Sequence, residues 1–355
     1  MSLYLAPTAA VATLPRLLAP PPIDIRRLER DMALRVPPPP PPPPLVTSTT
    51  NRYAGAKHKA VVVMGATGTG KSRLAVDLAL RFGGEVINSD KIQVYEGLDV
   101  ATNKVTAEEC AGVPHHLIGV VRDPDAEFAA PDFRREACRA AGAIAARGRL
   151  PVVAGGSNSF VEELVDGDRR AFRDRFDLCF VWVDVQLPVL HGHVARRVDE
   201  MRARGLVGEV AAAFDPRRTD YARGLWRAIG VPELDAYLRR RAAAAGVEED
   251  DDDDAELMLE DAIEEIKANT CALACRQRAK IQRLARMWRG VVRVDATEVF
   301  RRRGIAADEA WKRLVAAPCI EAVRSFLNDD GLVLPAADDL LLPDVPVFAP
   351  AAVAV

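Results

Sequence analysis

The chain has 355 residues, of which 49% are hydrophobic, and carries a formal net charge of −3 with an isoelectric point near 6.1. This composition supports a large apolar core, and the mild acidity excludes a nucleic-acid binder that relies on overall positive charge. Six scattered cysteines without a C-x-x-C pair indicate free thiols rather than a disulfide framework. No apolar run reaches the length of a membrane span, so we expect no membrane segment, and we expect a monomer.

Residues 1–57 differ from the rest of the chain in composition. Alanine, leucine and proline dominate, eight prolines stand together at Pro37–Pro44, and arginines outnumber acidic residues. Such a proline run is extended and cannot build a core. The composition predicts an organelle transit peptide, plastid more than mitochondrial, and the alternative is the leader of a cytoplasmic protein.

The segment after this leader carries the most specific motif of the chain. Eight residues fit G-x-x-x-x-G-K-[ST] position by position: Gly65, Ala66, Thr67, Gly68, Thr69, Gly70, Lys71 and Ser72. An apolar run precedes them and apolar residues at helical spacing follow, which is the strand, glycine loop and helix of a P-loop. The loop amides and the helix dipole favour an anion of two or more phosphates. Lys71 is expected to reach the outer phosphates and the Ser72 hydroxyl to bind Mg²⁺.

Three further apolar runs end in residues suited to a site. The first ends at Asp90, the second in the glycine turn Gly155-Gly156, and the third at Asp184. The carboxyl ends of strands in an open parallel sheet line one crevice, so Asp90 is expected beside the phosphate loop. The two glycines are expected where the backbone approaches a ligand closely. These patterns predict an α/β fold with a P-loop NTPase-like core, in which helices flank a parallel sheet.

The second half of the chain is predicted to be mainly helical. An arginine-rich helical insertion is expected over about 190–245, followed by an acidic loop at 248–254. A long amphipathic helix runs from about Ile263 to Trp288 by its apolar spacing, and a last strand follows at 291–294. The whole domain is expected to span 58–330, with an unstructured tail over 331–355.

Several side chains leave two interpretations open. The adjacent His115 and His116 are either metal ligands or, more in keeping with the absence of a third nearby ligand, one buried and one surface histidine. Four apolar residues either line a slot for an apolar substrate or belong to the core: Trp182, Leu225, Trp226 and Ile229. Three basic residues of the long helix either reach phosphates or form a solvated face: Arg276, Lys280 and Arg283.

Several long blocks resemble the plant adenylate isopentenyltransferases, in order, from about residue 58 to 320. The blocks include GATGTGKS, NSDKIQVYEGLDVATNK, GVPHHLIG, PVVAGGSNSF, RAIGVPELDAYL and AIEEIKANTCALACRQRAKIQRL. The resemblance implies transfer of a dimethylallyl group from dimethylallyl diphosphate to N6 of the adenine of AMP, ADP or ATP, the first step of cytokinin biosynthesis. Mg²⁺ is implied as the ion that assists departure of diphosphate.

The site residues follow from position and from this resemblance together. Asp90, at a strand end and within the family's SDKIQ block, is expected to accept a proton from N6 as the catalytic base. Lys71 is expected to absorb the charge of the leaving diphosphate. Thr102 matches a position that contacts the acceptor base, and Thr67 is a second candidate for that contact. Lys104 either serves the acceptor's phosphates or pairs with Asp99.

Three different functions remain open at the level of the sequence. A related enzyme that acts on adenosine in tRNA uses the same core chemistry, but no histidine follows His193, so the C-terminal C₂H₂ finger of many eukaryotic relatives cannot form. This and the acidic isoelectric point favour a free nucleotide over tRNA. The second function is that of a P-loop small-molecule kinase. The third is that of a non-catalytic nucleotide-binding switch, for which the chain lacks the N-K-x-D motif of GTPases.

Overall fold

The computed structural model describes residues 57–244 and 252–328. The proposed leader, the start of the acidic run and the tail over 331–355 therefore lie outside the described residues, and these predictions are not tested. Six strands are present in the described ranges: β1 His58–Gly65, β2 Gly84–Asn88, β3 His115–His116, β4 Leu150–Ala154, β5 Phe176–Asp184 and β6 Val292–Asp295.

The strands form one parallel sheet in the order β3-β2-β4-β1-β5-β6. The predicted strands are confirmed, and β1 and β4 lie at the centre, where their residues are buried on both faces. Because every strand is parallel, the connections cross over through helices and all carboxyl ends meet at one edge. That edge holds the P-loop after β1 and Asp90 after β2.

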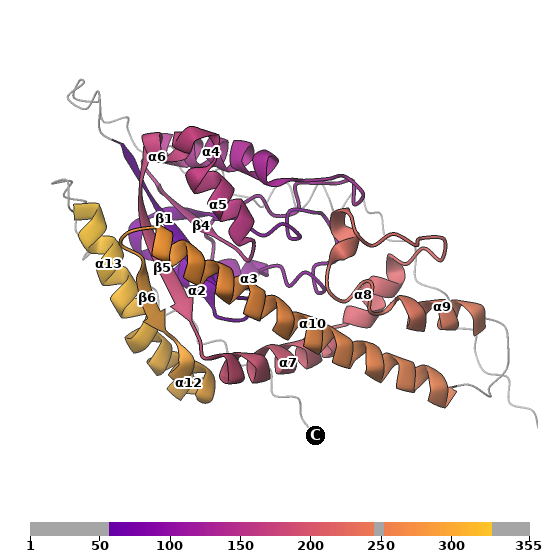
Figure 1. Ribbon diagram of the computed structural model, residues 1–355. Coiled ribbons are helices and arrows are strands. Elements are labelled where there is room, and N and C mark those ends of the chain that lie inside the picture. The colour runs from indigo at the N-terminus through magenta and orange to yellow at the C-terminus, as the bar shows by residue number, and fades with distance from the viewer. Residues whose placement is uncertain (1–56, 245–251, 329–355) are drawn as a thin grey trace, which may run out of the picture. The chain divides into compact units, whose positions relative to one another are not determined.

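Two core layers arise because successive side chains of a strand point to opposite faces of the sheet. In β1, Val61 and Val63 belong to the layer with α2 (Lys71–Phe82), whereas Val62 and Met64 belong to the other layer. The first layer is completed by helices that follow β6: α11 Thr297–Arg301, α12 Gly304–Trp311, the π-helix η3 Lys312–Ala316 and α13 Ala317–Asn328. The second layer is covered by α4 Ala130–Ala146, α5 Asn158–Asp166, α6 Ala171–Arg175 and the end of the long helix α10 Asp252–Met287 (Figure 1).

The region between β5 and the long helix is helical, with its own apolar cluster around Leu206 and Ile266. It contains α7 Leu187–Ala203, α8 Leu206–Ala212, the short η2 Gly224–Arg227 and α9 Asp235–Ala244. The first of these helices begins at Leu187 with Pro188 in its first turn, three residues before the expected start of the insertion. Figure 1 shows α10 running from the sheet to these helices, so one helix joins the two parts of the structure.

The long helix is confirmed as α10, Asp252–Met287. The predicted acidic loop at 248–254 is wrong at its end, because its last three residues already belong to this helix. Acidic side chains near a helix N-terminus interact favourably with the helix dipole, which explains why the acidic run continues into helix. Among the described residues, no helix combines the length and apolarity needed to cross a bilayer.

Candidate active site

The P-loop closes tightly on itself and presents an uncapped helix to the crevice. The Thr69 hydroxyl donates to the Ala66 carbonyl oxygen at 2.9 Å, and both residues are buried. Gly70 is the N-cap of α2 with a φ of 83°, and no side chain caps this helix. Its first N–H groups lack intrahelical acceptors, so they are available to an anion.

Asp90 follows β2 at the same edge, as predicted. Its Oδ1 accepts a hydrogen bond from the Ile92 N–H at 3.0 Å, which fixes the turn after the strand. A Cβ at Gly156 would lie only 2.6 Å from Asp90 Oδ2. The glycines after β4 therefore make room for the Ser89–Asp90 turn itself, a protein contact that was not expected from the sequence.

Lys71 and Arg197 bring two cations to the P-loop. Burial lowers the pKa of Lys71 from 10.5 to about 8, with Asp90 raising it and Arg197 lowering it further. Arg197, from α7, donates through Nη2 to the Thr67 hydroxyl at 2.7 Å. Its buried Nε has no hydrogen-bond partner among the described residues. An unpaired buried donor beside a phosphate loop indicates that an anion completes its interactions.

A second group of cations, called here the outer cations, consists of Lys91, Arg227 and Arg276. Both arginines lie within electrostatic reach of Lys91, and burial followed by Arg227 lowers the pKa of Lys91. The Nε of Arg227 is also buried without a hydrogen-bond partner in the described ranges. The carboxylate of Asp90 offsets only part of this positive charge, so the crevice is suited to bind more than one phosphate group.

In the sequence, Lys91 stands out only because it clusters with Lys71 and Lys104, which hints at charge for phosphate binding, and Arg197 and Arg227 are not assigned to the site. Lys91, Arg197 and Arg227 come from the turn after β2, from α7 and from η2, and only the folded chain brings them together. Lys91 was detectable from its place beside Asp90. Arg197 and Arg227 stood among many other arginines of the helical region, where spacing alone did not distinguish them from surface residues.

Gln277 of α10 ties three parts of the site together. Its Oε1 accepts from the Thr67 N–H at 2.7 Å, and its Nε2 donates to the Gly156 carbonyl oxygen at 2.7 Å. The P-loop, the loop after β4 and the long helix thus share one side-chain amide. Because both polar ends are engaged, Gln277 orders the site rather than offering free groups to a substrate.

Thr102 and Lys104, the other two expected acceptor contacts, lie on the loop 96–106. The Thr102 hydroxyl donates to the Leu98 carbonyl oxygen at 2.7 Å. Gln93, three residues after Asp90, holds this loop through the carbonyl oxygens of Thr102 and Asn103. The loop is therefore attached to the Asp90 turn.

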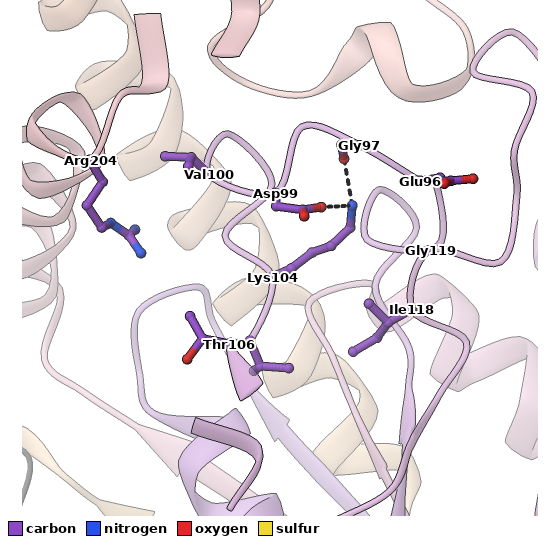
Figure 2. A pocket seen from close by; sticks show the side chains of 10 residues that line it. Glu96, Gly97, Asp99, Val100, Lys104, Thr106, Ile118, Gly119 and Arg204 are labelled. Carbon is purple, nitrogen blue, oxygen red and sulfur yellow. Dashed lines mark hydrogen bonds and ion pairs between the residues drawn. The ribbon is translucent and has the colours of Figure 1, made fainter. Parts of the chain in front are cut away.

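Lys104 pairs with Asp99, the second of its two expected roles. Its Nζ donates to Asp99 Oδ1 and to the Gly97 carbonyl oxygen, both at 2.6 Å, and its side chain is 7% exposed. Figure 2 shows this pair at the edge of a cavity of about 400 Å³, with Arg204 reaching in from the end of α7. Since Asp99 neutralises Lys104, the ammonium group does not act as a free phosphate ligand in this structure.

The remaining open interpretations resolve as structural roles. His116 contacts Glu85 Oε2 through Nε2 at 2.7 Å and His115 contacts the Val113 carbonyl oxygen through Nδ1 at 2.9 Å, so each has a protein partner. The four apolar residues considered for a slot belong to core clusters or pack against them: Trp182, Leu225, Trp226 and Ile229. Of the three basic residues of the long helix, Lys280 and Arg283 pair with Glu162, whereas Arg276 lies within electrostatic reach of Lys91 and stays a candidate for phosphate.

The residues present fit a divalent cation that is held mainly by substrate. The described part of the chain has no group of three or more His, Cys, Asp or Glu residues able to form a metal cage. Asp184, at the strand end where P-loop proteins often place a metal ligand, instead accepts from Arg278 at 2.8 and 3.0 Å and from Arg293. Ser72 is exposed at the start of α2. Mg²⁺ commonly takes few protein ligands, with phosphate oxygens and water as the others, so Ser72 suits that role.

Comparison with known proteins gives consistent matches. The model of the IPP transferase family matches residues 93–175 and 166–283. The chain is 56% identical to adenylate isopentenyltransferase 5, chloroplastic, of Arabidopsis thaliana, over 84% of this chain and 89% of that protein. It is 50% identical to adenylate isopentenyltransferase 7, mitochondrial, of the same plant, over 79% of this chain and 84% of that protein. The structure of the tRNA isopentenylpyrophosphate transferase of Bacillus halodurans is 26% identical, with a TM-score of 0.58, over 77% of this chain and all of that one.

Proposed function

Because this chain belongs to the IPP transferase family and within it to the adenylate isopentenyltransferases, we propose that it prenylates N6 of an adenine nucleotide. The donor is dimethylallyl diphosphate, and the product begins cytokinin biosynthesis. The observation that carries the proposal is the meeting of Asp90, Lys71 and Arg197 at one P-loop. A kinase needs the P-loop to hold a transferred phosphoryl group, whereas prenyl transfer needs it to hold a leaving group.

The donor's diphosphate is assigned to the P-loop. The uncapped N-terminus of α2 and Lys71 bind its oxygens, and Arg197 supplies a donor that is unpaired without an anion. As the bond between the allylic carbon and diphosphate breaks, negative charge grows on the leaving oxygens. Preorganised cations and N–H groups at this point stabilise the transition state more than the ground state. The Ser72 hydroxyl would hold a Mg²⁺ ion, which when bound would neutralise further charge on the leaving group.

The acceptor is assigned to the Asp90 side of the crevice. The N6 lone pair is delocalised into the adenine ring, so a base is needed to localise it. Asp90 accepts one N6 proton while N6 forms the bond to the allylic carbon and diphosphate departs with the bonding pair. Thr67 and Thr102 are proposed to orient the base, and the outer cations Lys91 and Arg276 are suited to the acceptor's phosphates.

A free nucleotide is favoured over tRNA as the acceptor. Relatives at 50% identity and above carry the adenylate isopentenyltransferase name, whereas the tRNA enzyme from Bacillus halodurans is 26% identical. The names of the relatives, chloroplastic in the first case and mitochondrial in the second, support an organelle, and we assign the protein to the plastid.

A product assay tests the proposal. The protein is incubated with dimethylallyl diphosphate, Mg²⁺ and AMP, ADP, ATP or unmodified tRNA in parallel, and prenylated product is identified by mass. Product on a free nucleotide is expected. Product on tRNA alone would make the protein an RNA-modifying enzyme, and no product from folded protein would contradict prenyl transfer.

The variant Asp90→Asn tests the base assignment in the same assay. Asparagine retains an Oδ1 that accepts from the Ile92 N–H, so the turn should persist, but its amide cannot take up the N6 proton. The rate of transfer should fall by roughly 100-fold to 10,000-fold, while the affinity for inorganic diphosphate stays within about twofold. A variant with a near-normal rate would show that another group removes the proton.

A further inference from the structure

Trp311, at the end of α12, packs directly against the outer side of the P-loop. Its side chain is 2% exposed. A Cβ placed at Gly70 would lie 2.7 Å from Trp311 Cζ3 and 2.8 Å from Cη2, so the indole ring rests on the backbone of Gly70. A larger residue at Gly70 is therefore disfavoured for two reasons: the left-handed φ of 83° strains any side chain, and a Cβ would clash with the indole ring.

The indole is also fixed to the helix that begins at this glycine. Its Nε1–H donates to Asp77 Oδ2 at 2.8 Å. The guanidinium of Arg73 lies over the ring at 4.8 Å from its centroid and pairs with Asp308 of α12 at 2.9 Å. Gly70, Arg73 and Asp77 have the i, i+3 and i+7 spacing of one helix face, so α12 is attached along the first two turns of α2.

These contacts act on the backbone that binds the anion. The N–H groups at the start of α2 point toward the crevice only while Gly70 keeps its left-handed conformation. The ring packs on the Gly70 backbone, and the Asp77 and Arg73 contacts hold it there. Burial raises the pKa of Asp77 and the indole hydrogen bond lowers it, so removal of the indole N–H leaves a half-buried carboxylate without this donor.

We propose that Trp311 is a positioning residue for the donor's diphosphate: it holds Gly70 and the first turn of α2 in the anion-binding conformation. The inference rests on the proposed function, because it takes the P-loop as the diphosphate site. Trp311 lies beyond the residues that the family model matches. It acts through Gly70, and a displacement of the loop amides by even about 1 Å lowers binding and rate strongly.

The chain contains a matched control for this tryptophan. Trp288 is 5% exposed, donates through Nε1 to Asp166 Oδ2 at 2.6 Å, and has the guanidinium of Arg173 at 5.9 Å from its ring centroid. The same three residue types thus form similar contacts in the other core layer, with the difference that Arg173 pairs with Asp166 itself. Replacement of either tryptophan by phenylalanine removes one indole N–H and a similar buried area.

Calorimetric titration with inorganic diphosphate tests the proposal without requiring prenyl transfer. Trp311→Phe should weaken diphosphate binding about tenfold, whereas Trp288→Phe should change it less than about twofold at a similar loss of melting temperature. In steady-state assays, KM for the donor should rise with Trp311→Phe while KM for the nucleotide stays constant. Asp77→Asn should bind diphosphate nearly as the wild type does, because its amide oxygen still accepts from the indole.

A second pair of variants covers the case in which Trp311→Phe does not fold. Asp77→Leu removes the acceptor and leaves the tryptophan, and Asp166→Leu is its counterpart at Trp288. If Trp311→Phe and Trp288→Phe, or Asp77→Leu and Asp166→Leu, lost diphosphate affinity equally, the positioning role would be overturned. The effect would then be one on general stability. Failure of the wild-type protein to bind diphosphate would instead contradict the donor assignment in the proposed function.

Discussion

Lys71 combines the charge that the P-loop needs with an environment that opposes this charge. Removal from water is the main cause that lowers its pKa to about 8, and Arg197 contributes in the same direction. Asp90 partly offsets both effects. The ammonium group is therefore charged but poorly compensated near neutral pH, which is a state that a diphosphate relieves when it binds.

The affinity for diphosphate should fall as the pH rises above about 8. Below this pH, Lys71 is already protonated in the free protein. Above it, Lys71 is mostly neutral and must take up a proton when the anion binds, because the bound anion raises the pKa of Lys71. Between about pH 8 and pH 9 the dissociation constant should rise about fivefold. Calorimetry with inorganic diphosphate at a series of pH values measures this change.

Lys71→Arg is the control, because a guanidinium stays charged throughout this range. Any remaining pH dependence in the variant reflects groups other than residue 71, namely diphosphate itself and Lys91, whose pKa is also lowered. A wild-type curve parallel to that of Lys71→Arg would show that Lys71 does not lose its charge near pH 8.

At the scale of elements, the aspartate at the end of β5 forms ion pairs that stabilise the fold instead of binding a metal ion. Asp184 is 3% exposed and is held by Arg278 from α10 and Arg293 from β6. This carboxylate joins the long helix to the edge of the sheet. Removal of one partner from a buried ion pair leaves uncompensated charge, so the pair matters to folding even where its net contribution is small.

Replacement of Asp184 should therefore affect stability and not the Mg²⁺ requirement. Asp184→Leu is expected to lower the free energy of unfolding by about 2–4 kcal/mol, because two arginines lose their common partner and both retain some access to water. Chemical denaturation measures this loss.

The Mg²⁺ dependence separates Asp184 from Ser72. In Asp184→Asn the Mg²⁺ concentration for half-maximal transfer should stay within about twofold, whereas Ser72→Ala should raise it about tenfold, since the hydroxyl is the proposed ligand. A comparable increase in Asp184→Asn would identify Asp184 as a metal ligand in the complex with substrate.

At the scale of the whole molecule, the residues of the proposed site all lie between Gly65 and Gln277. The proposed leader over 1–57 has an arginine-rich, proline-rich composition, which fits a targeting role. We expect residues 1–57, fused to a fluorescent protein, to direct it to plastids in plant cells. The fluorescent protein alone is the control. Fluorescence in mitochondria would reassign the organelle, and a cytoplasmic signal would contradict a transit peptide.

The sequence by itself determined the parallel α/β core, the P-loop and the position of Asp90 beside it. These features are local: continuous apolar runs, a glycine motif with fixed spacing, and a polar residue directly after an apolar strand. The long helix was predictable for the same reason, because its apolar spacing continues over many turns. The boundaries of the acidic run and of the helical insertion were less accurate, since helix ends depend on caps and dipoles more than on composition.

Only the tertiary structure decided which of the many basic residues serve the crevice. Arg197 and Arg227 reach it from separate helices, Lys104 is neutralised by Asp99, and Asp184 is occupied by two arginines. Trp311 likewise reads from sequence as an ordinary core residue, although it lies against Gly70 more than two hundred positions earlier. The physical reason is that an ion pair or a packing contact is set by distance in space, and residues far apart in the chain carry no periodic signal of their proximity.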